Sequence, residues 1–149
     1  MPTTRVSRTL AAPPQEVWGL ISDPWHQARW WPRVSRMEGV RDGHFTQVMM
    51  SARGRPVRAD FEILELDAPR LLRWGQELAG TPFERLLAQA ETAIALEPAD
   101  GGAATAVTIE LRQRLLGWSR LTPFLFKRAA RRQLTEALAG LDALVSPPV

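Results

Sequence analysis

The sequence contains no cysteine, no tyrosine and only two histidines, and its single lysine, Lys127, stands among 19 basic residues. Without cysteine the chain can form no disulfide and has no thiolate for catalysis or metal binding. With His26 and His44 as its only imidazoles, a zinc site would need carboxylate ligands as well. We therefore expect neither a metal site nor a cofactor.

Long hydrophobic runs are also missing. No stretch approaches the roughly 18 consecutive apolar residues of a membrane-spanning helix, and the N-terminus has neither the apolar core nor the cleavage site of a signal peptide. We therefore expect a cytoplasmic location. A chain of 149 residues with 45% hydrophobic content suits one compact domain with a complete core, so we expect a single domain over residues 1–149.

The charge is unevenly distributed along the chain. The stretch from Leu111 to Thr135 has seven basic residues and no acidic one, whereas the rest of the chain has 12 basic and 16 acidic residues. One interpretation is that these arginines cover the wet side of the last strand and helix, with their stems on apolar surface. The other is a binding patch, with Phe124 and Leu125 as apolar anchors, for an anionic membrane surface or another partner rather than for nucleic acid. The basic residues of this candidate patch are Arg120, Lys127, Arg128, Arg131 and Arg132.

The clearest helix signal runs from Thr122 to Val145. Thr122 is a suitable N-cap, and Pro123 suits the first helical position because its φ is fixed and it needs no N–H partner. Apolar residues then recur mostly at steps of three and four over about six turns. They are Phe126, Ala130, Leu134, Ala137, Leu138, Leu141 and Val145. This stripe must be buried against another layer, and the chain before it is mostly of strand character.

The N-terminal part predicts one strand followed by a bent pair of short helices. In the strand from Thr3 to Ala11, period two puts Arg8 on the face of Val6 and Leu10. There it needs a carboxylate or carbonyl partner, unless a twist or bulge turns it outward. Pro13 and Pro14 then open a helix over residues 15–22, and Asp23 caps a second helical segment that ends near Trp30 and Trp31.

A series of extended runs, separated by turn residues, fills the middle of the chain. The expected strands after Arg33 include residues 44–52, 57–67, 71–78, 83–97 and 105–115. The run 83–97 is ambiguous, since Glu84 to Glu91 are good helix formers. The alternation of Leu86, Ala88, Ala90, Thr92, Ile94 and Leu96 with mostly polar neighbours nevertheless favours a strand.

This order resembles the START-like superfamily, which includes polyketide cyclases and dehydrases, lipid-transfer domains and plant pollen allergens. The matching residues are Val6 to Ala11, Pro13, Pro14, Glu16, Val17, Trp18, Asp23, Pro24, Trp30, Pro32, Leu72 to Trp74, Gly80 to Phe83, Leu96 to Pro98 and the terminal helix. The resemblance implies an α+β helix-grip fold. In it, a curved antiparallel sheet of about seven strands, with two short helices after the first strand, packs against the long C-terminal helix.

The resemblance also implies a cavity between the sheet and the terminal helix that binds a small apolar or aromatic molecule or a lipid. A bent sheet cannot be filled by one helix with alanine at its contact positions. Strand parity and helical spacing place these residues on the cavity wall: Phe61, Trp74, Gln76, Ala90, Thr92, Gln113, Phe126, Ala130 and Leu134. Trp30 and Phe83 are expected near the mouth. A slip of one residue in any strand would exchange its set.

Each site residue also has a structural interpretation. Trp30 and Trp74 can be core residues, and the polar groups of Gln76, Thr92 and Gln113 can bond to backbone or water instead of orienting a ligand. The sequence makes no prediction of oligomeric state.

Cyclase or dehydrase activity is the alternative function that the resemblance offers. The chain has no tyrosine or cysteine for it, and strand parity turns Glu77, Glu91 and Glu97 outward. His26 is the one imidazole that could reach the mouth. We therefore name no catalytic residue, although a pocket can also catalyse by holding its substrate in a reactive shape.

Overall fold

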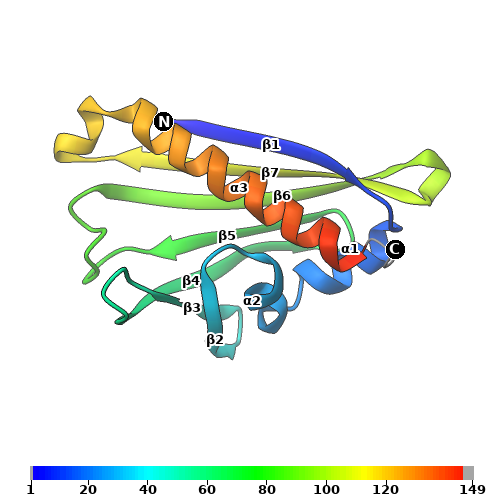
Figure 1. Ribbon diagram of the computed structural model, residues 1–149, viewed down its shortest axis with the longest axis horizontal. Coiled ribbons are helices and arrows are strands. Elements are labelled where there is room, and N and C mark those ends of the chain that lie inside the picture. Colours follow the sequence, from blue (N-terminus) through cyan, green and yellow to red (C-terminus); the bar gives the residue numbers. More distant parts are fainter. Residues whose placement is uncertain (1, 146–149) are drawn as a thin grey trace.

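The computed structural model describes residues 2–145 and shows a curved antiparallel sheet with one long helix lying across its inner face (Figure 1). The strands are β1 (Thr3–Leu10), β2 (Val34–Arg41), β3 (His44–Met50), β4 (Pro56–Asp67), β5 (Leu71–Glu77), β6 (Leu87–Ala99) and β7 (Ala104–Leu115). The helices are α1 (Pro14–Ile21), α2 (Gln27–Trp30) and α3 (Pro123–Val145). Short 3-10 turns occupy Pro24–His26, Asp100–Gly102 and Gly117–Leu121. The predicted α+β helix-grip fold is confirmed.

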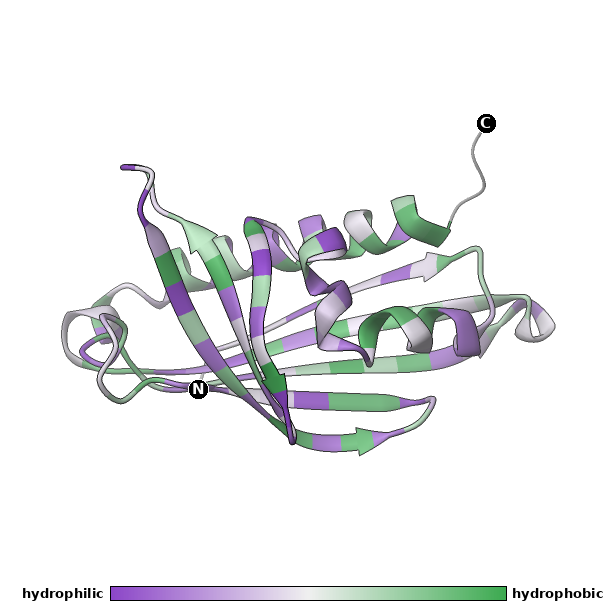
Figure 2. Ribbon diagram, turned by 90° about the horizontal axis from the view of Figure 1, so that it is seen from below, coloured by the Kyte–Doolittle hydropathy of each residue, from purple (hydrophilic) through white to green (hydrophobic). Residues whose placement is uncertain are grey.

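The sheet has the strand order β1-β7-β6-β5-β4-β3-β2, with every neighbouring pair antiparallel. Alternating hydropathy explains how it has one packed and one wet face, and Figure 2 shows green and purple residues alternating along several strands. In β7, for example, Val107, Ile109 and Leu111 are buried while the residues between them are partly exposed.

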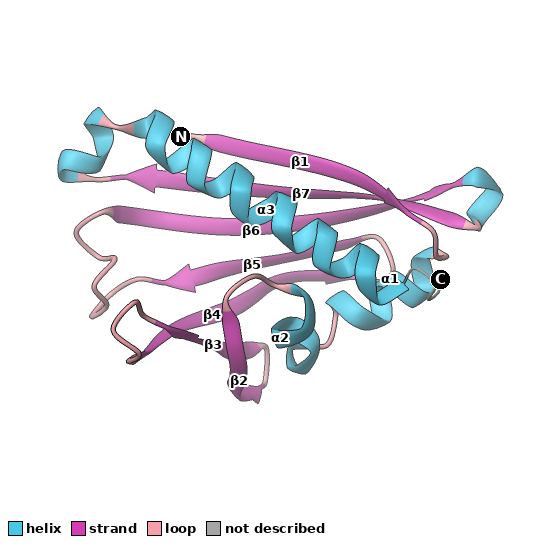
Figure 3. Ribbon diagram, viewed as in Figure 1, coloured by secondary structure: helices cyan, strands magenta, loops and turns pink. Residues whose placement is uncertain are grey.

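The long helix α3 packs on the inner face of the sheet, mainly against β1. α3 contacts β1 and β7 as well as α1 and α2, which come from the segment after the first strand (Figure 3). Six of the seven predicted stripe residues of α3 are buried; Phe126, near its start, is only half-buried. Leu134, Leu138 and Leu141 are almost completely buried, and each contributes about 1.5–3 kcal/mol of transfer free energy.

Arg8 occupies the face that strand parity predicts. Its Nη2 lies 2.7 Å from Oδ2 of Asp142 on α3, and its side chain is 44% exposed. Because β1 is an edge strand, the guanidinium reaches a carboxylate partner without leaving solvent. The expected cap also forms, since Oδ1 of Asp23 accepts a hydrogen bond from the Trp25 backbone N–H at 3.0 Å.

Two expectations about β6 were wrong in detail. β6 begins at Leu87 rather than at Phe83, and the pairing with β7 shifts by one residue between Leu87 and Gln89. This bulge reverses the parity before it, so Leu86 is 41% exposed while Leu87 is buried. The 3-10 turn Gly117–Leu121 lies between the last strand and the terminal helix.

None of the helices in the described part of the chain is long and apolar enough to cross a membrane.

Candidate functional site

A cavity of about 90 Å³ lies between the inner face of the sheet and α3. Residues from five neighbouring strands, β3 to β7, contribute to its wall, together with one residue after α2 and one on α3. They are Trp31, Gln47, Phe61, Trp74, Gln76, Ala90, Thr92, Leu111, Gln113 and Gln133.

Strand register explains why these side chains converge. Residues directly opposite each other on antiparallel strands project from the same face. Phe61 is opposite Gln76, Trp74 is opposite Thr92, and Ala90 is opposite Gln113. The wall is therefore a direct consequence of the pairing of β4 to β7.

The aromatic part of the wall is fixed by ring contacts. The Phe45 and Phe61 rings stack with centroids 5.2 Å apart, and Phe45 meets Trp74 edge-on at 5.6 Å. Trp74 meets Trp31 edge-on at 5.6 Å as well. Such pairs hold each other in defined orientations. The cavity therefore has a rigid aromatic side formed by Phe61, Trp74 and Trp31.

The polar part of the wall consists of four glutamines and one threonine. The Gln47 Nε2 donates a hydrogen bond of 2.7 Å to Oε1 of Gln27 on α2, and both residues are buried. The other side chains, those of Gln76, Thr92, Gln113 and Gln133, form no hydrogen bond within residues 2–145. Amides and a hydroxyl in this state can both donate to and accept from a bound molecule.

The wall has no ionisable side chain among the described residues. The Glu91 Oε1 lies 2.5 Å from Nη1 of Arg73, which also bonds to Glu65. The hydrogen bond with Glu65 raises the pKa of Arg73. Neither Arg73 nor its two carboxylate partners belong to the cavity wall. Glu77 has its Oε1 3.4 Å from Nδ1 of His44 and is exposed.

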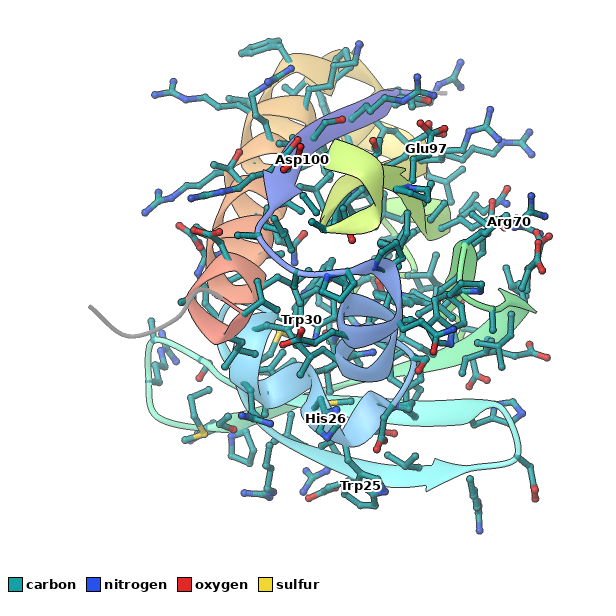
Figure 4. The ribbon with its side chains drawn as sticks, turned by 90° about the vertical axis from the view of Figure 1, so that its right-hand side faces the viewer. Trp25, His26, Trp30, Arg70, Glu97 and Asp100 are labelled. Atoms are coloured by element: carbon teal, nitrogen blue, oxygen red, sulfur yellow. The ribbon has the colours of Figure 1, made fainter. Side chains whose placement is uncertain are left out.

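The other imidazole also lies away from the cavity. The His26 Nδ1 is 3.2 Å from the Gly19 carbonyl oxygen. Figure 4 shows His26 beside Trp25, in the short segment that precedes α2. Within residues 2–145, no three histidine or acidic side chains come close enough together to hold a metal ion.

Six of the eleven residues predicted for the site line this cavity. They are Phe61, Trp74, Gln76, Ala90, Thr92 and Gln113. The structure brings them together through the strand faces from which they were predicted. That they bind a ligand stays a prediction.

The other five predicted residues lie elsewhere. Trp30 is buried beside the cavity residue Trp31 and makes an edge-on contact with it at 5.4 Å. Ala130 and Leu134 belong to the main core. Phe83 and Phe126 pack, half-buried, on a separate group of buried residues that we name the end cluster. It consists of Leu78, Leu87, Ala90 and Leu115 with these two phenylalanines.

Sequence reasoning missed four wall residues. Leu111 shares the strand face of Gln113, and Gln47 shares the strand face of the buried Phe45, so period two could have found both. Gln133 lies three residues after Ala130 and four before Ala137, which is the helical spacing of the buried stripe. Nothing in the pair Trp30 and Trp31 indicates which indole faces the cavity.

Comparisons with known proteins agree with this architecture. A family model described as polyketide cyclase/dehydrase and lipid transport matches residues 1–146. The search of curated proteins gave no match. Among solved structures, the chain is similar to the di-domain ARO/CYC BexL from the BE-7585A biosynthetic pathway, with 22% identity and a TM-score of 0.78. The match covers 96% of this chain and 46% of BexL, so the chain spans about half the length of that relative.

Two further solved structures match over nearly their whole length. A protein from Thermus thermophilus has 22% identity and a TM-score of 0.76, with 97% of each chain covered. A START superfamily protein from Mycobacterium smegmatis has 12% identity and a TM-score of 0.75, with 96% of each chain covered. At such identities the likeness establishes the fold, whereas the family model matches almost the complete sequence. The chain therefore belongs to the polyketide cyclase/dehydrase and lipid transport family.

Proposed function

We propose that this protein binds a small molecule with an aromatic or apolar body and at least one hydrogen-bonding group in the cavity between the sheet and α3. The observation that carries this proposal is the composition of the wall. Three aromatic side chains form one part of it, and another part has three amides and a hydroxyl, those of Gln76, Gln113, Gln133 and Thr92, without a hydrogen bond to the described part of the chain. Ligand sites combine apolar surface with a few convergent polar groups in this way.

The size of the cavity adds a condition. Pockets for drug-sized ligands measure about 300–1,000 Å³, whereas this one measures about 90 Å³. We infer that the cavity opens on binding, because a ligand larger than a few water molecules needs the walls to separate.

The end cluster is where we expect this opening. Ala90 belongs both to the end cluster and to the cavity wall, so the two adjoin. Phe83 lies in the loop between β5 and β6, and Phe126 lies near the start of α3; both are only half-buried. Because both rings are only half-buried, moving them away from the end cluster exposes less of each side chain than moving a fully buried core residue would.

Cyclase or dehydrase chemistry is the alternative, because the family name includes these enzymes. Acid–base catalysis needs an ionisable group within reach of the substrate. His26, Glu77 and Glu91 are the candidates from the sequence, and each has a partner away from the wall. We therefore favour binding without acid–base turnover. Turnover of a bound polyketide that is lost when these three residues are replaced would favour the enzyme instead.

Calorimetric titration with naphthalene and with naphthol tests the binding proposal. Both probes should bind, and naphthol should bind more tightly because its hydroxyl can bond to a free amide of the wall. The variant Gln113→Leu should reduce the preference for naphthol while leaving naphthalene binding in place. A protein that binds neither probe, and that carries no small molecule in native mass spectrometry after purification, would overturn the proposal.

A further inference from the structure

One end of the molecule exposes four large apolar side chains close together in the sequence. Trp118 is 84% exposed, Leu121 68%, Phe124 65% and Leu125 51%. We name these four residues the apolar tip. They come from the turn after β7 and from the first turn of α3. Single exposed apolar residues are ordinary, but four within eight residues, two of which, Trp118 and Leu121, line one surface hollow, indicate an interaction surface.

The turn that carries the tip is held in place by hydrogen bonds. The buried Ser119 hydroxyl donates a hydrogen bond of 2.6 Å to the Leu86 carbonyl, which also accepts a bond of 2.8 Å from the Leu116 backbone N–H. Gly117 adopts a φ of 56°, which favours glycine. The turn is therefore attached to the loop between β5 and β6, at the end of the sheet where α3 begins (Figure 1). These hydrogen bonds fix the backbone that carries the exposed Trp118.

Within residues 2–145, several basic side chains close to the tip in the sequence have no ion-pair partner. Arg112 and Arg132 pair with Glu110 and Glu136. The remaining basic residues of the stretch 111–135 form no ion pair within residues 2–145: Arg114, Arg120, Lys127, Arg128 and Arg131. No acidic residue lies in this stretch.

Two of these cations border a surface hollow beside the tip. Arg114 and Arg120 line a depression of about 420 Å³ together with Pro2, Leu116 and Pro123. A depression with two unpaired guanidinium groups and apolar walls fits a phosphate with an attached alkyl chain, because arginine binds phosphate through two parallel hydrogen bonds.

We propose that the apolar tip docks on the surface of an anionic phospholipid bilayer. Trp118 and its apolar neighbours enter the interfacial layer, while Arg114, Arg120 and Lys127 contact the lipid phosphates. Tryptophan favours this layer because its ring has an apolar body and a polar N–H. The positive charge of these residues complements the negative charge of the lipid surface. Each basic residue near such a surface contributes about 1 kcal/mol to the binding free energy, or about fivefold in affinity.

Docking would place the bilayer next to the end cluster. Phe126 of that cluster lies two residues after Phe124 of the tip, and Leu87 follows the loop residue Leu86 that holds the turn. The bilayer would thus lie at the end of the molecule that holds the end cluster. This proposal does not depend on ligand binding in the cavity, and its test does not measure such binding.

Co-sedimentation tests the proposal, with vesicles of phosphatidylcholine alone and of equal parts phosphatidylcholine and phosphatidylglycerol. We expect binding to the anionic vesicles that weakens as salt is added. The double variant Arg120→Glu/Lys127→Glu should lose at least about 25-fold in affinity, because two contributions of about fivefold are removed. The control Arg53→Glu/Arg55→Glu makes the same charge change in the hairpin between β3 and β4 and should bind better than the tip variant.

A second pair of variants separates insertion from charge attraction. Trp118→Ala should abolish the blue shift of tryptophan fluorescence on adding anionic vesicles. Trp25→Ala removes another exposed indole, 56% exposed and remote from the tip, and should keep the shift. The proposal is overturned if Trp118→Ala binds like the unchanged protein. It is also overturned if the protein ignores both vesicles and instead self-associates through Trp118.

Discussion

Gly140 of α3 lies directly against the backbone of Trp30, at the end of α2. A Cβ atom at position 140 would overlap the Trp30 carbonyl oxygen and lie 3.0 Å from the Trp30 Cα atom. Glycine at this point therefore permits the close approach of α2 and α3. That approach places Trp31, the next residue, on the cavity wall.

Replacing Gly140 by alanine should destabilise the fold. The added methyl group forces the two backbones apart, which costs about 1–3 kcal/mol in a packed core, whereas the gain in helix propensity is at most about 1 kcal/mol. We expect the free energy of unfolding, measured by urea denaturation, to fall by about 1–2 kcal/mol.

Gly19→Ala is the matched control. Gly19 is a helical glycine in α1, and beyond its own helix backbone no described atom lies within 4 Å of an added Cβ. Alanine there should raise the free energy of unfolding by about 0.5–1 kcal/mol. Equal effects of the two substitutions would contradict the close contact between α2 and α3.

The buried pair of Gln27 and Gln47 supports a second prediction. Gln47→Met keeps the side-chain size but leaves the Gln27 amide buried without its partner, at a cost of about 1–3 kcal/mol. The double variant Gln27→Met/Gln47→Met removes both polar groups and should recover most of that loss. A double variant whose loss in unfolding free energy equals the sum of the two single losses would show that the amides do not interact.

Glu38 supplies a prediction about pH. The hydrogen bond from Arg58, and next the one from Arg36, lowers the pKa of Glu38 below its usual value of 4.5. The folded protein thus holds this proton less tightly than the unfolded chain does. The contribution of Glu38 is therefore complete above pH 4.5 and is lost as the pH falls through the lowered pKa.

Glu38→Gln measures this contribution. The difference in urea midpoint between the unchanged protein and the variant should be small, because the carboxylate is still partly exposed to solvent, and it should shrink on acidification below pH 4.5. A difference that stays constant through the acidic range would show that the arginines do not favour the ionised form in the fold.

Strand faces were the part of the site that the sequence could predict. Once β4 to β7 are paired, period two alone places Phe61, Trp74, Gln76 and Gln113 on the inner face. The reason is physical, because adjacent residues of a strand must point to opposite sides. The same rule failed before the bulge in β6, where it turned Leu86 inward.

The sequence could not predict which residues of α3 line the cavity. The helical stripe correctly indicates that Ala130 and Leu134 are buried, but burial does not distinguish core from cavity wall. Only the position of α3 over β1 and β7 leaves Gln133 facing the open space. That position depends on the Gly140 contact, which no local pattern reveals.

The cavity itself is tested most directly by naphthol binding to a pair of alanine variants. Ala90→Phe places a ring in the cavity, whereas Ala88→Phe places the same ring at the exposed bulge of the same strand. Near-UV circular dichroism checks that both are folded, and Ala90→Val offers a milder filling if the larger ring disturbs the core.

We predict that calorimetric titration will show at least about a tenfold loss of naphthol affinity for Ala90→Phe, because the buried area offered to the ligand is removed. A smaller loss should accompany Ala90→Val, and Ala88→Phe should bind like the unchanged protein. Undiminished binding by a folded Ala90→Phe variant would contradict the assignment of this cavity as the ligand site.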